Sequence, residues 1–255
     1  MTKLNRFAIF LLLSTFACLG ARAATLEQPE IIGTVLINRT TQENFNTFGE
    51  HALAAPGLGA VSARVTGTPA PSIIVHAEMG DSESDLLFGR AVAILRYVVQ
   101  ITGPDAVVPV EIGVAGHASA AADEGATFVV QSAWQLIDAN GTGPVVASDQ
   151  ISTPQQGGSF SQSFGRTVNV NLQTNRLYLV ELRADAEAAA SVVGSSVVAD
   201  AYVDPWFRFA SGVDTSLFAF QFTTGIGNVA PVPLPPALLG FGAALAVLGW
   251  RRRAG

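Results

Sequence analysis

The sequence predicts an all-β protein, an antiparallel β-sandwich of jelly-roll-like type, with an N-terminal signal peptide and a C-terminal transmembrane helix. Three observations support this prediction. Apolar residues in the body alternate with polar ones at a period of two, which is typical of strands with one buried face. Glycine, proline and asparagine separate these stretches. Each end of the chain carries an apolar segment beside basic residues.

Residues 1–23 have the three parts of a secretory signal peptide. Lys3 and Arg6 form the basic start, an apolar stretch follows them, and Ala21 and Ala23 form an A-x-A cleavage site. Signal cleavage is therefore expected after Ala23, which places the body of the protein outside the cytoplasm.

The single cysteine of the chain, Cys18, lies inside this leader. The mature body therefore has no disulfide and no thiol chemistry. A lipoprotein signal acylated at Cys18 is the alternative interpretation, but Thr15 stands where such signals usually carry leucine.

The body, residues 24–228, is expected to form one β-sandwich domain, because about two hundred residues bury a sizeable core. It holds eight arginines, no lysine and all 20 carboxylates of the chain, a net charge of about −12. Such a surface repels phosphate backbones and anionic membranes, so no nucleic-acid partner is expected.

Strand periodicity recurs along this body between turn residues. The segments that carry it are 31–38, 91–101, 108–114, 128–136, 168–172, 177–182, 197–203 and 217–222. The segments 168–172 and 177–182 are expected to form a hairpin across the turn at 173–175. Residues 41–53 can hold one short helix.

The C-terminal tail has three parts. A Pro-rich motif occupies 229–236, an uncharged apolar run follows at 237–250, and a basic tail at 251–255 ends the chain. The run is expected to be a transmembrane helix, although its fourteen residues rise only about 21 Å against a hydrocarbon core of roughly 30 Å. Arginines after it would lie at the cytoplasmic face, as the positive-inside rule demands. A buried core helix is the alternative. The stop-transfer residues are Trp250, Arg251, Arg252 and Arg253.

These three parts in order, together with the signal peptide, resemble the PEP-CTERM sorting signal of Gram-negative bacteria. The motif residues are Val232, Pro233, Leu234, Pro235 and Pro236. Leu234 replaces the usual glutamate, which is similar to the VPLPA-type variant, and Pro236 stands where alanine is common. These two differences from the usual motif bear on which exosortase would recognise the tail.

The resemblance implies an exosortase as processing partner and transient residence in the inner membrane. The processed body would then reach the cell surface or the extracellular space. The body itself is similar to those of PEP-CTERM proteins at Tyr97, at Gly103-Pro104 and at the ending 225–228. Such bodies look like β-sandwiches without an assigned biochemical role, so the resemblance implies no catalytic residue.

Motifs for chemistry are not found in this sequence. His51, His76 and His117 lie far apart without metal-ligand spacing, and a zinc or general-base site would need spatial convergence. The acidic stretch 81–85 lacks the glycine and the distal glutamate of a calcium loop. No G-x-S-x-G motif and no phosphate-binding glycine loop occurs. We therefore expect no catalytic residue, no metal and no cofactor.

Aromatic residues between 206 and 222 leave two interpretations open. Phe218, Phe220 and Phe222 alternate, which favours packing in the core, as it does for Trp134. Alternatively, Trp206 with the nearby Asp204 could form a platform on which a sugar ring stacks.

Three functions therefore compete. The leading one is a non-catalytic surface or extracellular-matrix protein, associated with exopolysaccharide or biofilm. The second is a carbohydrate-binding module that uses Trp206 and Asp204. The third is a secreted hydrolase, which would need a carboxylate pair or a histidine cluster converging in a groove.

Overall fold

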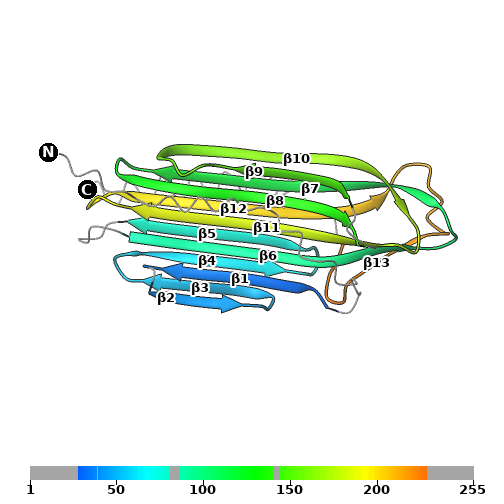
Figure 1. Ribbon diagram of the computed structural model, residues 1–255, viewed down its shortest axis with the longest axis horizontal. Coiled ribbons are helices and arrows are strands. Elements are labelled where there is room, and N and C mark those ends of the chain that lie inside the picture. The colour runs from blue at the N-terminus through cyan, green and yellow to red at the C-terminus, as the bar shows by residue number, and fades with distance from the viewer. Residues whose placement is uncertain (1–27, 39, 81–86, 140–143, 229–255) are drawn as a thin grey trace.

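The computed structural model describes residues 28–38, 40–80, 87–139 and 144–228, and two antiparallel sheets make up this part of the chain (Figure 1). The strands are β1 Glu30–Ile37, β2 Thr41–Phe45, β3 Gly49–Ala55, β4 Gly59–Thr66, β5 Ser72–Gly80, β6 Leu87–Thr102, β7 Val107–Ala122, β8 Ala126–Asp138, β9 Val145–Ser152, β10 Gly158–Gln173, β11 Leu177–Ala190, β12 Ser196–Phe209 and β13 Ala219–Phe222. Within these ranges we find no helix that is long and apolar enough to cross a membrane.

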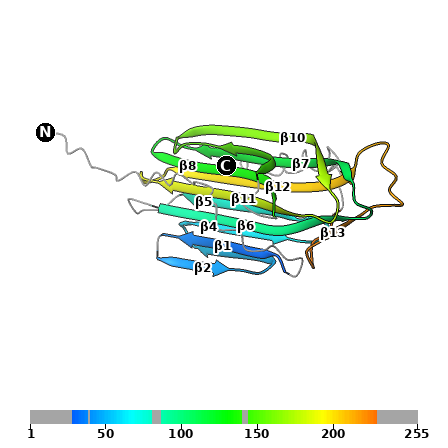
Figure 2. The ribbon, with the colours of Figure 1, turned by 45° about the vertical axis from the view of Figure 1, so that its right-hand side comes forward.

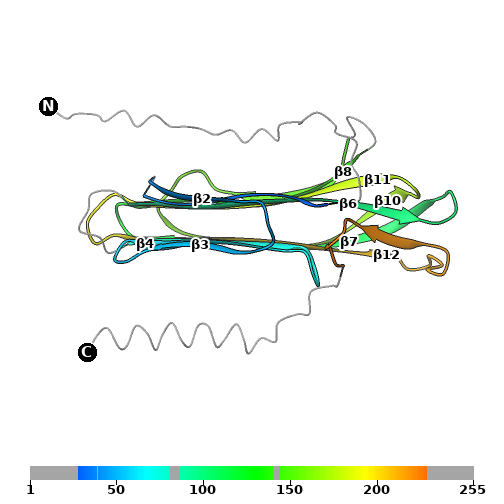
Figure 3. The same ribbon diagram turned by 90° about the horizontal axis from the view of Figure 1, so that it is seen from below.

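The two sheets lie face to face as separate layers (Figure 3). Sheet A has the order β2-β1-β6-β11-β8-β9, and β13 pairs with the end of β6. Sheet B has the order β10-β7-β12-β5-β4-β3. From β5 to β12, every connection except that between β8 and β9 crosses from one sheet to the other, which is the winding of a jelly roll. The prediction of an antiparallel sandwich is confirmed.

Two local predictions are wrong. The expected hairpin between 168–172 and 177–182 does not form, because β10 pairs with β7 in sheet B while β11 pairs with β6 and β8 in sheet A. The expected helix within 41–53 is replaced by β2 and β3, which belong to different sheets. The strands β4, β5 and β9 were not predicted.

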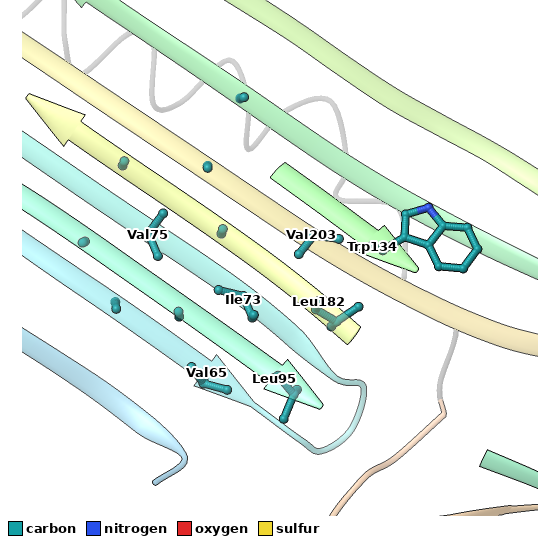
Figure 4. Packing of buried hydrophobic residues seen from close by; sticks show 14 of the residues in the cluster. Val65, Ile73, Val75, Leu95, Trp134, Leu182 and Val203 are labelled. Carbon is teal, nitrogen blue, oxygen red and sulfur yellow. The ribbon is translucent and has the colours of Figure 1, made fainter. Parts of the chain in front are cut away.

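The inner faces of both sheets form one apolar core, which the expected rows supply together with the unpredicted strands β4 and β5 (Figure 4). In β6 the alternate residues from Ala91 to Ile101 are all buried, and in β8 the same holds from Phe128 to Leu136. Trp134 is 1% exposed, which confirms its assignment to the core.

Alanine fills much of the space between the central strands. Small side chains of this kind let two sheets approach closely. The Ser132 hydroxyl on β8 of sheet A consequently donates a hydrogen bond across the core to the Tyr202 carbonyl on β12 of sheet B, at 2.6 Å. The buried alanines in the described part of the chain are Ala63, Ala77, Ala91, Ala93, Ala118, Ala120, Ala126, Ala133, Ala184, Ala186, Ala188, Ala190, Ala199 and Ala201.

β13 lies at one end of the sandwich (Figure 2). Phenylalanine rings pack together around it. Phe209 stacks on Phe220, with ring centroids 4.3 Å apart, and Phe207 meets Phe222 edge-on at 5.8 Å. Phe207 is buried, and Phe218, Phe220 and Phe222 pack against the core. The core interpretation of the alternating phenylalanines is therefore confirmed.

The last described residues cross from sheet A to sheet B and join the two. The Thr223 amide donates to the Val98 carbonyl on β6, and the Gly227 amide donates to the Gly67 carbonyl beyond β4. Asn228 then pairs with the backbone of Phe207 on β12: its Oδ1 accepts from the Phe207 amide and its Nδ2 donates to the Phe207 carbonyl, both at 2.8 Å. These hydrogen bonds hold the chain to the sandwich as far as Asn228.

Candidate functional site

The outer face of sheet B brings together the residues that the sequence singled out on β12. Alternation along β12 places Val203, Pro205 and Phe207 on the inner face and turns Asp204 and Trp206 toward the outer face. The outward row on β12 is Val198, Asp200, Tyr202, Asp204, Trp206 and Arg208. Asp204 and Trp206 are thus adjacent on one face, whereas Asp200 lies about 20 Å from Trp206 at about 3.3 Å per residue.

Trp206 belongs to this outer face and not to the core. Its indole ring is half-buried because it covers the backbone of Gly113, the opposite residue on β7. The Arg208 guanidinium lies 5.1 Å from the centre of the ring and forms a salt bridge with Glu111 on β7. The arrangement holds an aromatic ring against the sheet, beside the outward residues of β7 and β10.

Asp204 lies between Tyr202 and Trp206 and is 6% exposed. Its Oδ2 accepts a hydrogen bond from the Tyr202 hydroxyl at 2.8 Å, while its Oδ1 is buried without a hydrogen-bond partner. Burial raises the pKa of the Asp204 carboxyl, and the bond from Tyr202 opposes this rise. Burial and the neighbouring carboxylate raise the pKa of the Tyr202 hydroxyl, which therefore stays a donor. Asp204 consequently orients Tyr202.

A histidine with two carboxylates lies further along the same face. His76 on β5 bonds through Nδ1 to Asp200 Oδ1 at 2.7 Å, and its Nε2 lies 3.7 Å from Glu78 Oε2. The hydrogen bond to Asp200 is the largest cause that raises the pKa of the His76 imidazole; burial opposes it, and the negative charges of Asp200 and Glu78 add to it. His76 is thereby favoured in its cationic form.

Ser62 on β4 stands opposite His76, so serine, histidine and aspartate follow one another across three strands. The described hydrogen bonds of His76 go to Asp200 and not to Ser62, and the three residues lie on the open face of the sheet. In the described part of the chain, Pro109, Val213 and Phe218 line one shallow hollow, and Trp134, Val145 and Asp149 line another. This row of residues lines neither hollow.

The remaining histidines serve other contacts. His51 on β3 stacks on Phe45 of β2, with ring centroids 4.0 Å apart, and bonds to Glu43 at 2.9 Å, so it ties sheet B to sheet A. His117 on β7 faces outward opposite Tyr202. Among the described residues, no three histidine, cysteine or carboxylate side chains are placed to hold a metal ion.

The outer face of sheet A has a different character, because arginines and carboxylates pair along it. Arg90 bonds to Asp185 at 2.7 Å, and Arg96 bonds to both Glu181 and Glu30. In each pair, the arginine charge is neutralised by a carboxylate on a neighbouring strand. The outer face of sheet B carries the Trp206 ring beside the polar side chains of Tyr202 and Asp204.

Several predicted site residues lie outside the described part of the chain. They are the cleavage residues Ala21 and Ala23, the motif Val232, Pro233, Leu234, Pro235 and Pro236, the stop-transfer group Trp250, Arg251, Arg252 and Arg253, and the acidic stretch 81–85. The pair His76–Asp200 was missed, since its members are 124 residues apart and the pairing of β5 with β12 is not visible in the sequence. Alternation along 200–208 was the only local signal for this face.

The chain matches no known protein family, and no curated protein is similar to it in sequence. Among solved structures it is similar to the enzymatically active domain of tailspike protein 4 from bacteriophage CBA120, at 11% identity and a TM-score of 0.19, over 72% of this chain and 21% of that one. It is also similar to a structure of infectious bursal disease virus Gt strain, at 10% identity and a TM-score of 0.18, over 92% of this chain and 69% of that one. The chain thus spans about a fifth of the length of the tailspike chain. With TM-scores this low, neither likeness bears on function.

Proposed function

We propose that this chain is an exported, non-catalytic protein of the cell surface or extracellular matrix, processed at its tail by an exosortase-type enzyme. The predicted signal peptide at 1–23, the motif at 229–236, the apolar run at 237–250 and the basic end would together serve as the sorting signals. The observation that most supports this proposal is the pair of hydrogen bonds between Asn228 and the Phe207 backbone. These bonds hold the chain to the sandwich as far as the last residue before the tail. A cut within the tail would therefore leave the sandwich intact.

The position of the two ends of the sandwich also supports this proposal. Glu30, at the start of β1, lies opposite Arg96 on β6, and Thr223 bonds to Val98 on the same strand. The chain therefore enters and leaves the sandwich at the same end. A precursor held at the membrane through its tail would extend the other end, with its loops 123–125 and 191–195, away from the bilayer.

The test is the intact mass and cell fractionation of the chain, with Arg251, Arg252 and Arg253 present or replaced by alanine. The unaltered chain should lose mass from about Pro231 onward and appear outside the cell, whereas the alanine variant should keep its tail. Replacing Arg64, Arg166 and Arg208 by alanine removes the same charge from the body and should leave processing unchanged. Retention of the full tail in the inner membrane by all three proteins would mean an ordinary anchor.

Carbohydrate binding on the outer face of sheet B is a second candidate function. The observation that favours it is the placement of Trp206, which lies outside the core and next to Asp204, the acceptor of the Tyr202 hydroxyl. Aromatic rings on sheet faces stack on the apolar faces of sugars, and adjacent polar groups bind the hydroxyls. In this candidate Asp204 acts through Tyr202.

Affinity electrophoresis in gels that contain the exopolysaccharide of the producing cell tests this candidate. Trp206→Ala should abolish the retardation of the protein. Ile74→Ala removes another apolar side chain from the outer face of sheet B, one that is 43% exposed on β5, and should leave the retardation unchanged. Equal retardation of both variants would assign any binding to another surface.

A further inference from the structure

β10 is a long sheet edge that no described strand covers. It pairs with β7 over its full sixteen residues, from Gly158 opposite Ala122 to Gln173 opposite Val107, without a register shift. Its other side is the margin of sheet B, and it forms the upper border of the molecule in Figure 1. Every second residue of such a strand turns its N–H and C=O groups away from the sheet. The free edge is about 53 Å long at 3.3 Å per residue.

The other edges in the described part of the chain are short and are protected in ways that edge strands commonly use. β2 has five residues and includes Glu43, and β3 has seven and includes Glu50. β9 has eight residues, includes Asp149 and pairs with β8 through a register shift, while β13 has four. Shortness, charge and irregularity all oppose the addition of another strand.

β10 has none of these protective features. It contains no proline and no carboxylate, and its only charged residue is Arg166. Arg166 is occupied within its own molecule, by Asp149 at 2.9 Å and by the Ser148 carbonyl at 3.0 Å. The outward residues are small and uncharged, namely Ser159, Ser161, Ser163, Gly165, Thr167, Asn169 and Asn171.

The inner side of β10 leaves apolar groups partly uncovered. Leu172 is the only fully buried residue of the strand. Phe160, Phe164, Val168 and Val170 pack against the core yet remain half-buried. A strand added at this edge would extend the sheet and cover part of this row, which adds apolar burial to the backbone hydrogen bonds.

We propose that two copies of this chain associate by antiparallel pairing of β10 with β10, which joins their B sheets into one. The occupant is a second copy because an antiparallel pair of identical strands is self-complementary about a two-fold axis. Each copy also presents the same half-buried row at the seam. The body carries a net charge of about −12, so two copies repel over most of their surfaces, and β10 offers a long strip without a carboxylate.

The test is the sedimentation velocity of the full chain in detergent micelles, with two matched double variants. Ser163→Glu with Thr167→Glu places two carboxylates on the outward side of β10. Ala52→Glu with Ala54→Glu places the same charge on the outward side of β3, the opposite edge of sheet B. The unaltered chain and the β3 variant should sediment as dimers, and the β10 variant as a monomer. Equal masses for all three proteins would overturn the proposal, and far-UV circular dichroism verifies that the variants are folded.

Cross-linking gives a second measurement that does not depend on disrupting the edge. In a Cys18→Ala background, Gly165→Cys places one thiol near the middle of β10, where an added Cβ meets nothing within 4 Å. A bismaleimide that spans about 15 Å tolerates a two-fold axis within two residues of this position. It should produce a covalent dimer with Gly165→Cys and none with Ala54→Cys. Absence of the dimer at position 165, or equal yield at both positions, would contradict β10 pairing.

Discussion

Trp206 on β12 lies directly over the backbone of Gly113 on β7: a Cβ atom at position 113 would come within 2.0 Å of Trp206 Cε2. The glycine is therefore required by the ring and not by a turn. This contact holds the indole against the outer face of sheet B, where the candidate site lies.

Gly113→Ala should displace the Trp206 ring and lower the free energy of unfolding by about 1–3 kcal/mol, as overpacking of a close contact does. Urea unfolding measures this change, and a shift in tryptophan emission reports the ring. Gly165→Ala is the control, because it adds a methyl group to an outward glycine of β10 that has nothing within 4 Å. If Gly113→Ala and Gly165→Ala lowered the free energy of unfolding equally, the Trp206 ring would move aside without an energetic cost.

The bond between His76 and Asp200 predicts a pH-dependent contribution to stability. Because the pKa of His76 is raised in the folded state, its stabilisation is present below the unfolded value of 6.5 and is lost as pH rises through the folded value. His76→Gln should therefore lower the free energy of unfolding by about 0.2–1 kcal/mol at pH 5.5 and by less at pH 8.5. Urea unfolding of the parent and the variant at both pH values tests this prediction. The same difference in unfolding free energy at pH 5.5 and pH 8.5 would exclude a contribution from the protonation of His76.

Asp204 predicts the same direction of pH dependence, because stability again falls as pH rises, but here removal of the group should stabilise the protein at neutral pH. Its pKa is raised by burial, so the charged carboxylate disfavours the folded state above its folded pKa, and this penalty is relieved as pH falls through that value. Asp204→Asn keeps an oxygen that can accept the Tyr202 hydroxyl. The variant should have a higher urea midpoint than the parent at pH 7, with the difference vanishing below about pH 4.

A comparison for this prediction is Asp214→Asn. Bonds from Ser216 lower the pKa of this exposed carboxyl. Its removal should slightly lower the midpoint at pH 7. Equal shifts for Asp204→Asn and Asp214→Asn would show that the burial of Asp204 has no energetic effect.

Two arginine pairs should differ in their contribution to stability because they differ in exposure. The Arg96 side chain is 17% exposed and its partner Glu181 is 9% exposed. Arg96→Ala would leave a nearly buried carboxylate to which Gln135 still donates, so we expect a loss of about 2–3 kcal/mol. Arg208 is 62% exposed beside Glu111, and Arg208→Ala should cost below about 1 kcal/mol. Thermal or urea unfolding of both variants measures the contrast, and equal losses would contradict it.

Alternation along single strands made much of the fold predictable. The buried rows of β6 and β8 follow from apolar residues at every second position, and so does the outward placement of Trp206 relative to Phe207. The same alternation is present in β4 and β5, where every second residue from Val61 to Val65 and from Ile73 to Met79 is buried. β2 was mistaken for part of a helix because only its last residue, Phe45, is buried and four polar residues precede it.

The candidate site was only partly accessible to sequence reasoning. Tyr202, Asp204 and Trp206 share a face because they are two residues apart, and this spacing is local. The partners that define their environment come from other strands: Gly113 below the ring, Glu111 beside Arg208, and His76 against Asp200. Each of these contacts depends on which strands are neighbours.

The sequence by itself determined the strand character of the body and the inner and outer faces of its longer strands, and it predicts a leader and a sorting tail at its ends. The tertiary structure alone decided which sheet each strand joins, that β10 and β11 separate instead of forming a hairpin, and that β10 is left as a long edge. The reason is physical: a period of two records whether a side chain faces the core or the solvent, but it is identical in both sheets. The choice of neighbour depends on how all the strands cover one another at once.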